Sequence, residues 1–305
     1  MDKEQIVAKQ SNGTARNYVV TWGDSSYGGD LTGKDSDKAS GVPGGELDNV
    51  QHIFSTEGAF AALKEDGSVV AWGNSSRGGD LTGQDIHNAT GVTGGELDNV
   101  QHIFSTRSAF AALKENGSVV AWGNSSGGGD LTPQDSFYVT GVTGGKLENV
   151  QQIFSTRSAF AALKEDGSVV AWGDSSGGGD LTPQDINYAT GVTGGKLENV
   201  QHIFSTEGAF AALKEDRSVV TWGDSKVGGD LTGQDSDNAT GVTGGELDNV
   251  QHIFSTRYAF AAIVDSSPTN SSGFSQIPFS IIFSTFSILL LMIGMAYLWR
   301  AKTRN

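Results

Sequence analysis

The hydrophobic and polar positions of this chain repeat with a period of 50 residues. In one repeat, small, β-branched and aromatic residues form three runs: "VQHIFST" at 50–56, "AFAALK" at 59–64 and "SVVAWG" at 68–73. Such runs, bounded by polar residues and glycine, predict short β-strands. Asp66-Gly67 between the last two runs indicates a two-residue type I′ hairpin turn, which needs positive φ at both positions. We therefore expect three local antiparallel strands in each repeat.

The remainder of each repeat is rich in turn-forming residues. Residues 74–99, "NSSRGGDLTGQDIHNATGVTGGELDN", are mostly Asn, Asp, Ser, Thr and Gly, which favour turns. We expect one short outer strand near "ATGV" and loops elsewhere. Repeat four has Arg217 where the other hairpins have glycine. A left-handed non-glycine residue costs roughly 1–2 kcal/mol, so we expect a different turn there and a higher melting temperature for Arg217→Gly.

The repeats predict an all-β chain built as a β-propeller of about five 50-residue blades. The chain begins with only the third run, "NYVVTWG" at 17–23, and its repeats end with only the second, "AFAAIVD" at 259–265. We expect Val19 and Val20 to pair with Phe260 and Ala261, because this pairing closes the ring and covers exposed strand edges. An open array of five units is the alternative.

The pattern "ALKEDGSVVAWGNSSRGGDLTG" resembles the regulator of chromosome condensation repeat family, and also the related bacterial beta-lactamase-inhibitory propeller. The resemblance covers residues 17–265 and implies a propeller with four-stranded blades, usually seven of them. The family commonly has a glycine and a histidine before the "AL" strand, and Thr56 and Ala59 stand in those places here. The resemblance therefore carries over no catalytic or exchange-factor residue, and implies a rigid disc that binds other proteins through its loops.

Composition and charge narrow the functional classes. The chain has no cysteine, which excludes disulfides and thiolate metal sites, and its net charge of −15 disfavours binding to nucleic acid. No nucleophile–base–acid set is visible, so we expect no enzyme activity, no catalytic residue and no cofactor. Four repeats have a histidine at one strand position, and repeat three has Gln152 there instead. The histidines are His52, His102, His202 and His252. We therefore expect no metal site, and we interpret the acidic turns near Asp24 and Asp174 as turns rather than calcium loops.

Differences between the repeats gather at three loop positions, where exposed Tyr, Phe and Arg are of the types that anchor interfaces. Recognition by loops on a rigid scaffold fits this distribution, and so does drift in unconstrained loops. The candidate protein-binding residues are Tyr27, Glu57, Arg77, His87, Arg107, Phe137, Tyr138, Arg157, Tyr188, Glu207, Arg257 and Tyr258.

Residues 277–299, "IPFSIIFSTFSILLLMIGMAYLW", carry no charge. As a helix they would span roughly 35 Å at about 1.5 Å per residue, enough to cross a bilayer core of about 30 Å. We expect a single-pass transmembrane α-helix here, followed by a basic tail at 300–305. Small residues such as Ser280, Ser284 and Gly294 share one face. They allow a weak homodimer in the membrane, although serine is also simply tolerated in such helices.

The segments together predict a membrane-anchored β-propeller that serves as a protein–protein interaction module. A flexible lead at 1–16 precedes the propeller at 17–265, and a polar spacer at 266–276 joins it to the membrane helix. The basic tail favours a propeller outside the cytoplasm, whereas the absence of a signal sequence favours a cytoplasmic one, which we slightly prefer. The alternatives are a regulator of a small GTPase, by family analogy, and an extracytoplasmic inhibitor or adhesion disc.

Overall fold

The structure is a computed structural model that describes residues 17–32, 39–40, 47–81, 97–131, 146–181, 188–190, 196–231 and 247–265. All elements in these residues are β-strands and single-turn 3-10 helices (η). In the first half they are η1 (Ser25–Tyr27), β1 (Ala39–Ser40), β2 (Val50–Ser55), β3 (Ala59–Lys64), β4 (Val69–Asn74), η3 (Ser75–Arg77), β5 (Val100–Ser105), β6 (Ala109–Lys114), β7 (Val119–Gly123) and η5 (Ser125–Gly127). In the second half they are β8 (Val150–Ser155), β9 (Ala159–Lys164), β10 (Val169–Gly173), η6 (Ser175–Gly177), β11 (Tyr188–Thr190), β12 (Val200–Ser205), β13 (Ala209–Lys214), β14 (Val219–Asp224), η8 (Ser225–Val227), β15 (Val250–Ser255) and β16 (Phe260–Val264).

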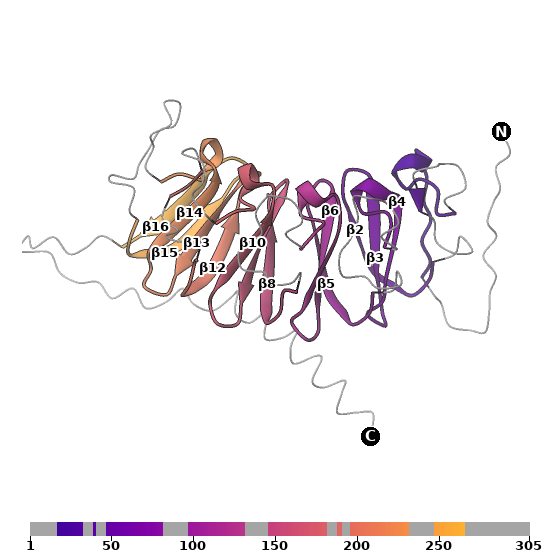
Figure 1. Ribbon diagram of the computed structural model, residues 1–305, viewed down its shortest axis with the longest axis horizontal. Coiled ribbons are helices and arrows are strands. Elements are labelled where there is room, and N and C mark those ends of the chain that lie inside the picture. Colours follow the sequence, from indigo (N-terminus) through magenta and orange to yellow (C-terminus); the bar gives the residue numbers. More distant parts are fainter. Residues whose placement is uncertain are drawn as a thin grey trace, which may run out of the picture. The chain divides into compact units, whose positions relative to one another are not determined.

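Each repeat forms its own antiparallel sheet, and the sheets follow one another in sequence order (Figure 1). The strand orders are β1-β4-β3-β2, β5-β6-β7, β10-β9-β8, β11-β14-β13-β12 and β15-β16. The three predicted strands of each complete repeat are confirmed, and this repeated architecture is consistent with propeller blades. The expected outer strand is present as β1 and β11, while residues 82–96, where it was first expected, lie outside the described residues.

The hairpin turn differs from the predicted type I′ turn. Gly67 has φ +79°, but Asp66 is not among the residues with positive φ. The Gly67 amide donates to the Lys64 carbonyl at 3.0 Å, and the Lys64 amide donates to the Ser68 carbonyl at 2.9 Å. A three-residue loop with one left-handed glycine has this pattern. The Asp66 carboxylate then accepts the Ser68 hydroxyl at 2.6 Å, which fixes the turn.

The prediction of a different turn at Arg217 is wrong. Arg217 adopts φ +68° in the same turn, and its amide donates to the Lys214 carbonyl at 2.9 Å. A Cβ at the equivalent Gly67 would lie 3.4 Å from Asn99 Cα, an ordinary contact, so a side chain fits. The guanidinium donates to the carbonyls of Asn249 at 2.9 Å and Val250 at 3.2 Å, and it also pairs with Asp265. These bonds offset the backbone strain.

We now expect Arg217→Gly to leave stability almost unchanged, because the relief of backbone strain is offset by the lost side-chain bonds. Arg217→Ala loses the same bonds and keeps the left-handed residue, so it should be less stable than Arg217→Gly by about 1 kcal/mol. Thermal unfolding of the two variants side by side measures this difference. Equal melting temperatures would show that the left-handed conformation costs nothing at this turn.

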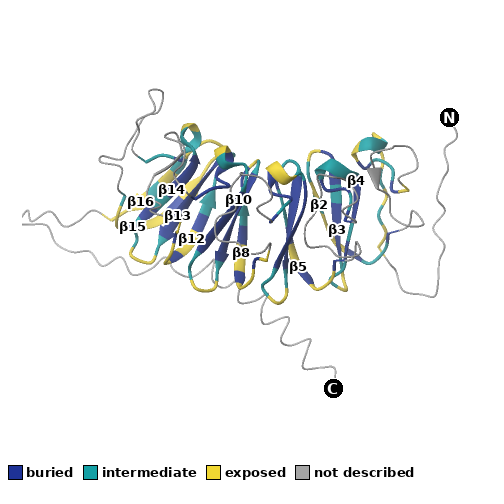
Figure 2. Ribbon diagram, in the orientation of Figure 1, coloured by how far each residue is buried: buried dark blue, intermediate teal, exposed yellow. Residues whose placement is uncertain are grey.

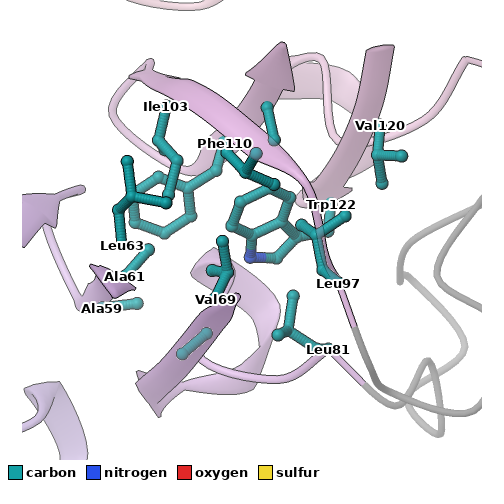
Figure 3. Close-up of a cluster of buried hydrophobic side chains, with 13 residues drawn as sticks. Ala59, Ala61, Leu63, Val69, Leu81, Leu97, Ile103, Phe110, Val120 and Trp122 are labelled. Carbon is teal, nitrogen blue, oxygen red and sulfur yellow. The ribbon is translucent and has the colours of Figure 1, made fainter. Parts of the chain in front are cut away.

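The hydrophobic core lies between consecutive sheets. One cluster contains Ala59, Ala61 and Leu63 from the first sheet together with Phe110 and Trp122 from the second, all at most 2% exposed (Figure 3). The middle strand alternates, so Ala61 and Leu63 contact the next sheet while Phe60 and Ala62 pack on the preceding side. Each middle strand is thus covered on both faces, which explains why it contains almost no polar residue.

The two ends of the array depart from this pattern. The predicted pairing of Val19 and Val20 with Phe260 and Ala261 is not found among the described residues. Instead, the Val19 amide donates to the Leu47 carbonyl at 2.9 Å, while Phe260 and Ala261 pair with Ser255 and Phe254 in β15. The N-terminal strand follows the rule of the complete repeats, in which the third strand docks on the loop that opens the next repeat, as Val69 docks on Leu97. The outer face of β16 stays exposed (Figure 2).

Residues 277–299 lie outside the described residues, as do the lead at 1–16, the spacer at 266–276 and the tail at 300–305. Within the described part of the chain, the structure contains no helix with the length and apolar character needed to cross a membrane. The predicted transmembrane helix and the homodimer through it therefore receive no support from the structure.

Candidate interaction surface

The turn between the first and second strands of each repeat is held by a threonine. The Thr106 hydroxyl donates to the Gly127 carbonyl at 2.9 Å and accepts the Ala109 amide at 3.1 Å. Thr56, Thr156 and Thr206 make the same pair of bonds in their repeats. These bonds tie the turn to the neighbouring 3-10 helix, so the residue that follows each threonine is presented at a fixed place.

The residues after these threonines form a backbone ladder that joins the repeats. The amide of Glu57 donates to the carbonyl of Arg107 at 2.9 Å, Arg107 to Arg157 at 3.0 Å, Arg157 to Glu207 at 2.7 Å and Glu207 to Arg257 at 2.8 Å. We call these five residues the inter-repeat ladder. Five of the twelve candidate binding residues thereby come into one continuous line. Sequence reasoning had placed them only at equivalent loop positions.

The charged side chains of the ladder form two groups. At one end, Glu57 pairs with Arg77 at 2.9 Å, where the Arg77 side chain is 36% exposed and that of Glu57 is 53% exposed. At the other end, the Glu207 carboxylate accepts Arg257 Nε at 2.5 Å and Arg157 Nη1 at 3.3 Å. The Glu207 side chain is only 18% exposed, whereas that of Arg257 is 69% exposed. The Arg257 guanidinium also lies 5.2 Å from the ring centroid of Tyr258, a cation–π distance.

These contacts change the acidity of the Glu207 group. The hydrogen bond from Arg257, aided by the charges of Arg257 and Arg157, lowers the pKa of Glu207 below its ordinary value of 4.5. The same hydrogen bond raises the pKa of Arg257. Glu207 is therefore held as a carboxylate between two arginines at neutral pH, so this end of the ladder is a fixed pattern of alternating charge.

Glu207→Gln should remove a pH-dependent part of the stability. Because the folded pKa of Glu207 is lowered, its contribution is present above pH 4.5 and is lost as the pH falls through the folded pKa. The variant should therefore melt below the natural chain at pH 7, and the gap should close as the pH falls below the folded pKa of Glu207. Glu115→Gln, at an exposed position away from the ladder, is the matched control. A gap that closes equally in both variants would show that the arginine contacts of Glu207 are not its cause.

Arg107 is the second residue of the ladder and has no ion pair among the described residues. Its Nε atom is buried and makes no hydrogen bond in the structure. Its ladder neighbour Arg157 is also basic, so positive charge is concentrated at this step. A buried N–H without an acceptor is costly, and a carboxylate or carbonyl oxygen from outside the described residues would satisfy it.

Two of the three variable positions in the repeats are coupled by volume. A Cβ added to Gly127 would lie 2.3 Å from Ser108 Oγ, and one added to Gly177 would lie 2.4 Å from Ser158 Oγ. In the repeats with the larger residues Arg77 and Val227, the facing position is glycine: Gly58 and Gly208. In each repeat, therefore, one of the two facing positions is glycine, and the other carries the larger side chain. Variation at 77, 127, 177 and 227 therefore reflects packing, and comparison of the two positions across the repeats could have revealed it.

The other candidate binding residues are not brought into the ladder. Tyr27 is 49% exposed at the N-terminal end of the array, and the backbone of Tyr188 pairs with Asp224 in the outer strand β11. His87, Phe137 and Tyr138 lie outside the described residues. The strand histidines are exposed, and His52 lies beside Phe54 with ring centroids 6.2 Å apart.

The described residues contain no group of three His, Asp or Glu side chains that could hold a metal ion. The acidic turns have a structural role, since the carboxylates of Asp24 and Asp174 each accept the amide two residues later at 2.9 Å. These bonds cap the 3-10 helices that follow.

Comparisons with known proteins point to similar folds at low identity. No protein-family model and no curated protein sequence matches the chain. Yeast RCC1 (Prp20), solved with Kap60, is similar with a TM-score of 0.41 and 20% identity over 68% of this chain and 51% of that one. Human WBSCR16 has a TM-score of 0.37 and 18% identity, over 57% of this chain and 47% of that one. The CRINKLY WD40 ectodomain of an Arabidopsis thaliana receptor kinase has a TM-score of 0.32 and 16% identity, over 58% of this chain and 52% of that one. The chain spans about half the length of these structures.

Proposed function

We propose that the chain is a propeller-type protein-interaction module that binds an acidic segment of a partner protein along the inter-repeat ladder. The observation that carries this proposal is the half-buried Arg107, which has no ion pair among the described residues and lies next to a second arginine in a line fixed by backbone hydrogen bonds. A carboxylate side chain of a partner would pair with this guanidinium and neutralise this step. Charge-assisted hydrogen bonds of this kind are among the strong ones in proteins.

In the single chain, the exposed end of the ladder provides a second anchor. Tyr258 is 55% exposed and lies beside Arg257, which is also exposed. Tyrosine and arginine are the residue types that most often dominate binding energy at interfaces. The paired Glu207 keeps Arg257 in place, so the surface is preorganised. Less side-chain entropy is therefore lost when a partner binds.

Proximity labelling with the intact chain tests the proposal. Arg107→Glu places a like charge opposite an acidic partner and should reduce labelling of specific partners about tenfold or more, as expected for a loss of 1.5–3 kcal/mol. Lys114→Glu makes the same charge change at the opposite end of the second repeat's middle strand β6 and should leave labelling unchanged. Equal loss in both variants, or no loss with Arg107→Glu, would contradict binding at the ladder.

We also propose that residues 277–299 tether this module to a membrane, with the repeats on the cytoplasmic side. The support is the uncharged run of 277–299 and the basic residues that follow it. The full chain should remain in the membrane pellet after alkaline carbonate extraction, and a chain ending at Gln276 should be released. Treatment with glycosidase should not change the mass of the full chain, although it contains acceptor sequences such as those at Asn88 and Asn270. Release of the full chain, or a mass shift, would contradict the tether or its orientation respectively.

A further inference from the structure

The exposed hydrophobic residues of the array are concentrated at its two ends. In the described residues, nine large hydrophobic side chains are exposed. Five belong to the N-terminal strand, η1 or the first sheet, and four belong to the last repeat. They are Tyr18, Val20, Trp22, Tyr27 and Ile53, and Phe254, Tyr258, Ile263 and Val264. Ile53 shows the effect of position, because it is 47% exposed while its equivalent Ile103, covered by a preceding sheet, is 3% exposed. Concentrated exposed apolar surface indicates an interaction site.

Among the described residues, the last repeat has no third strand. In the complete repeats, a tryptophan from that strand stacks on the phenylalanine of the middle strand, as Trp222 does on Phe210 at 5.2 Å. The Trp222 Nε1 also donates to the carbonyl of Gly178 in the preceding repeat at 2.9 Å. In the last repeat, Phe260 is only partly buried against Gly228, and β16 pairs with β15 alone. No described residue therefore pairs with the second edge of β16.

The N-terminal strand has the sequence that this edge requires. Residues 19–24 read "VVTWGD", identical to β14 at residues 219–224. Nevertheless, Trp22 is 84% exposed and Val20 is 62% exposed, whereas Trp222 is fully buried. The same six residues thus form a packed strand in the fourth repeat, whereas at the N-terminus they form no strand and Trp22 is left exposed.

The inter-repeat ladder is also incomplete at both ends. Among the described residues, no hydrogen bond is donated by the Arg257 amide or accepted by the Glu57 carbonyl, although the other ladder residues make both bonds. Thr256 also makes fewer hydrogen bonds than its equivalents, because among the described residues its hydroxyl bonds only within its own turn. In the other repeats this hydroxyl donates to the last residue of a 3-10 helix, such as Gly127. Tyr27 holds the equivalent position at the N-terminus.

We propose that residues 19–23 of one molecule pair as a strand with β16 of a second copy of this chain, so that molecules associate head to tail. Within one molecule, the N-terminal strand is already fixed on the first repeat, through Val19 on Leu47 and through Asn17, whose amide side chain bonds to Val50 at 2.7 Å and 3.0 Å. A second copy can fill the edge of β16 without breaking these contacts. The contact continues an interface that the chain already builds four times between its own repeats, and it adds a strand to a free edge.

The register follows from the pairing of β13 with β14, where Phe210 lies opposite Trp222 and Leu213 opposite Val219. Phe260 therefore lies opposite Trp22 of the second copy, and Ile263 lies opposite Val19. Trp22 Nε1 then donates to the Gly228 carbonyl, and the Arg257 amide donates to the Glu57 carbonyl. Because the two surfaces differ, the contact is heterologous, and further copies can add until a ring closes or a filament grows.

The test uses two variants of the full chain in detergent, with the protein mass measured by light scattering or sedimentation. Trp22→Ala removes the ring that enters the edge, and Ile263→Asp places a charge on the exposed face of β16. Each variant alone should stay at the mass of one chain, 31.8 kDa. An equimolar mixture should double this mass, because each variant retains the surface that the other lacks. The natural chain should grow in mass as its concentration rises.

Several outcomes would overturn the proposal. The natural chain can remain monomeric at every concentration, as it would if its own two ends closed on each other, or the mixture can remain monomeric. Association of either single variant, or of a double Trp22→Ala/Ile263→Asp variant, would place the contact elsewhere, for example in residues 277–299. Unchanged far-ultraviolet dichroism of both variants, together with rescue in the mixture, separates loss of contact from loss of folding.

Discussion

Trp172→Ala is expected to lower the free energy of unfolding by about 3–5 kcal/mol, the range for removing a large buried aromatic side chain. Trp172 is fully buried, and its ring stacks on Phe160 with centroids 5.2 Å apart. Its Nε1 donates to the carbonyl of Gly128 in the preceding repeat at 2.9 Å. The substitution therefore leaves a cavity between two sheets and an unsatisfied carbonyl at the junction of two repeats.

Two further substitutions separate these contributions. Trp172→Phe keeps much of the apolar volume but removes the N–H donor, so it should cost less, about 1–3 kcal/mol, mainly for the Gly128 carbonyl. Trp22→Ala is the matched control, because the same residue type in the same repeat position is 84% exposed there. At a concentration low enough to keep the chain monomeric, Trp22→Ala should leave the unfolding curve unchanged.

Urea unfolding followed by far-ultraviolet circular dichroism measures all three variants without relying on tryptophan fluorescence. The slope of the transition must be compared as well as its midpoint, because repeat arrays can lose cooperativity when one junction is weakened. A Trp172→Ala midpoint equal to that of Trp22→Ala would show that the tryptophan junctions do not hold the repeats together.

The strands of the complete repeats could be predicted from the sequence because their signals are local. The runs at 50–56, 59–64 and 68–73 coincide with β2, β3 and β4 within one or two residues. The hairpin turn was misjudged in type, since the Asp-Gly signal occurs both in two-residue turns and in the three-residue loop found here. Arg217 was misjudged for a different reason: its compensating bonds reach Asn249 and Asp265, which are far away in sequence.

The candidate site could be predicted only in part. Glu57, Arg107 and their equivalents stand out as variable loop residues, but the backbone ladder between them depends on how consecutive sheets stack, which no local pattern encodes. The predicted pairing of the N-terminal residues with β16 is not found among the described residues, because a sequence specifies which segment fits beside a strand and not which molecule supplies it. The pairs Ser108–Gly127 and Ser158–Gly177 were available in the sequence as correlated changes between repeats, and they separate packing from recognition.

Gly178→Ala is expected to destabilise the chain by about 3 kcal/mol. Gly178 has φ +94° at the end of η6, where an alanine costs about 1–2 kcal/mol. In addition, its Cβ would lie 2.7 Å from Phe210 Cδ2 and 3.4 Å from Trp222 Cδ1, in a junction whose aromatic rings are fully buried. Forcing these rings apart adds about 1–3 kcal/mol of overpacking.

Two other glycines of the chain serve as controls for the backbone cost and the overpacking cost. Gly167 also has a positive φ, +76°, but a Cβ there would lie 3.5 Å from Asn199 Cα, an ordinary contact, so Gly167→Ala should show the backbone cost alone. Gly228 has φ +106° and would place its Cβ 2.6 Å from Phe260, yet Phe260 is only partly buried and has no tryptophan beside it in the monomer. Gly228→Ala should therefore fall between the other two in chemical unfolding curves.

If Gly178→Ala costs no more than Gly167→Ala, the aromatic junction is loose enough to admit a methyl group. A tightly packed junction predicts the opposite order, because the ring that would have to move is held there by a stacked tryptophan and a hydrogen bond to the glycine's own carbonyl.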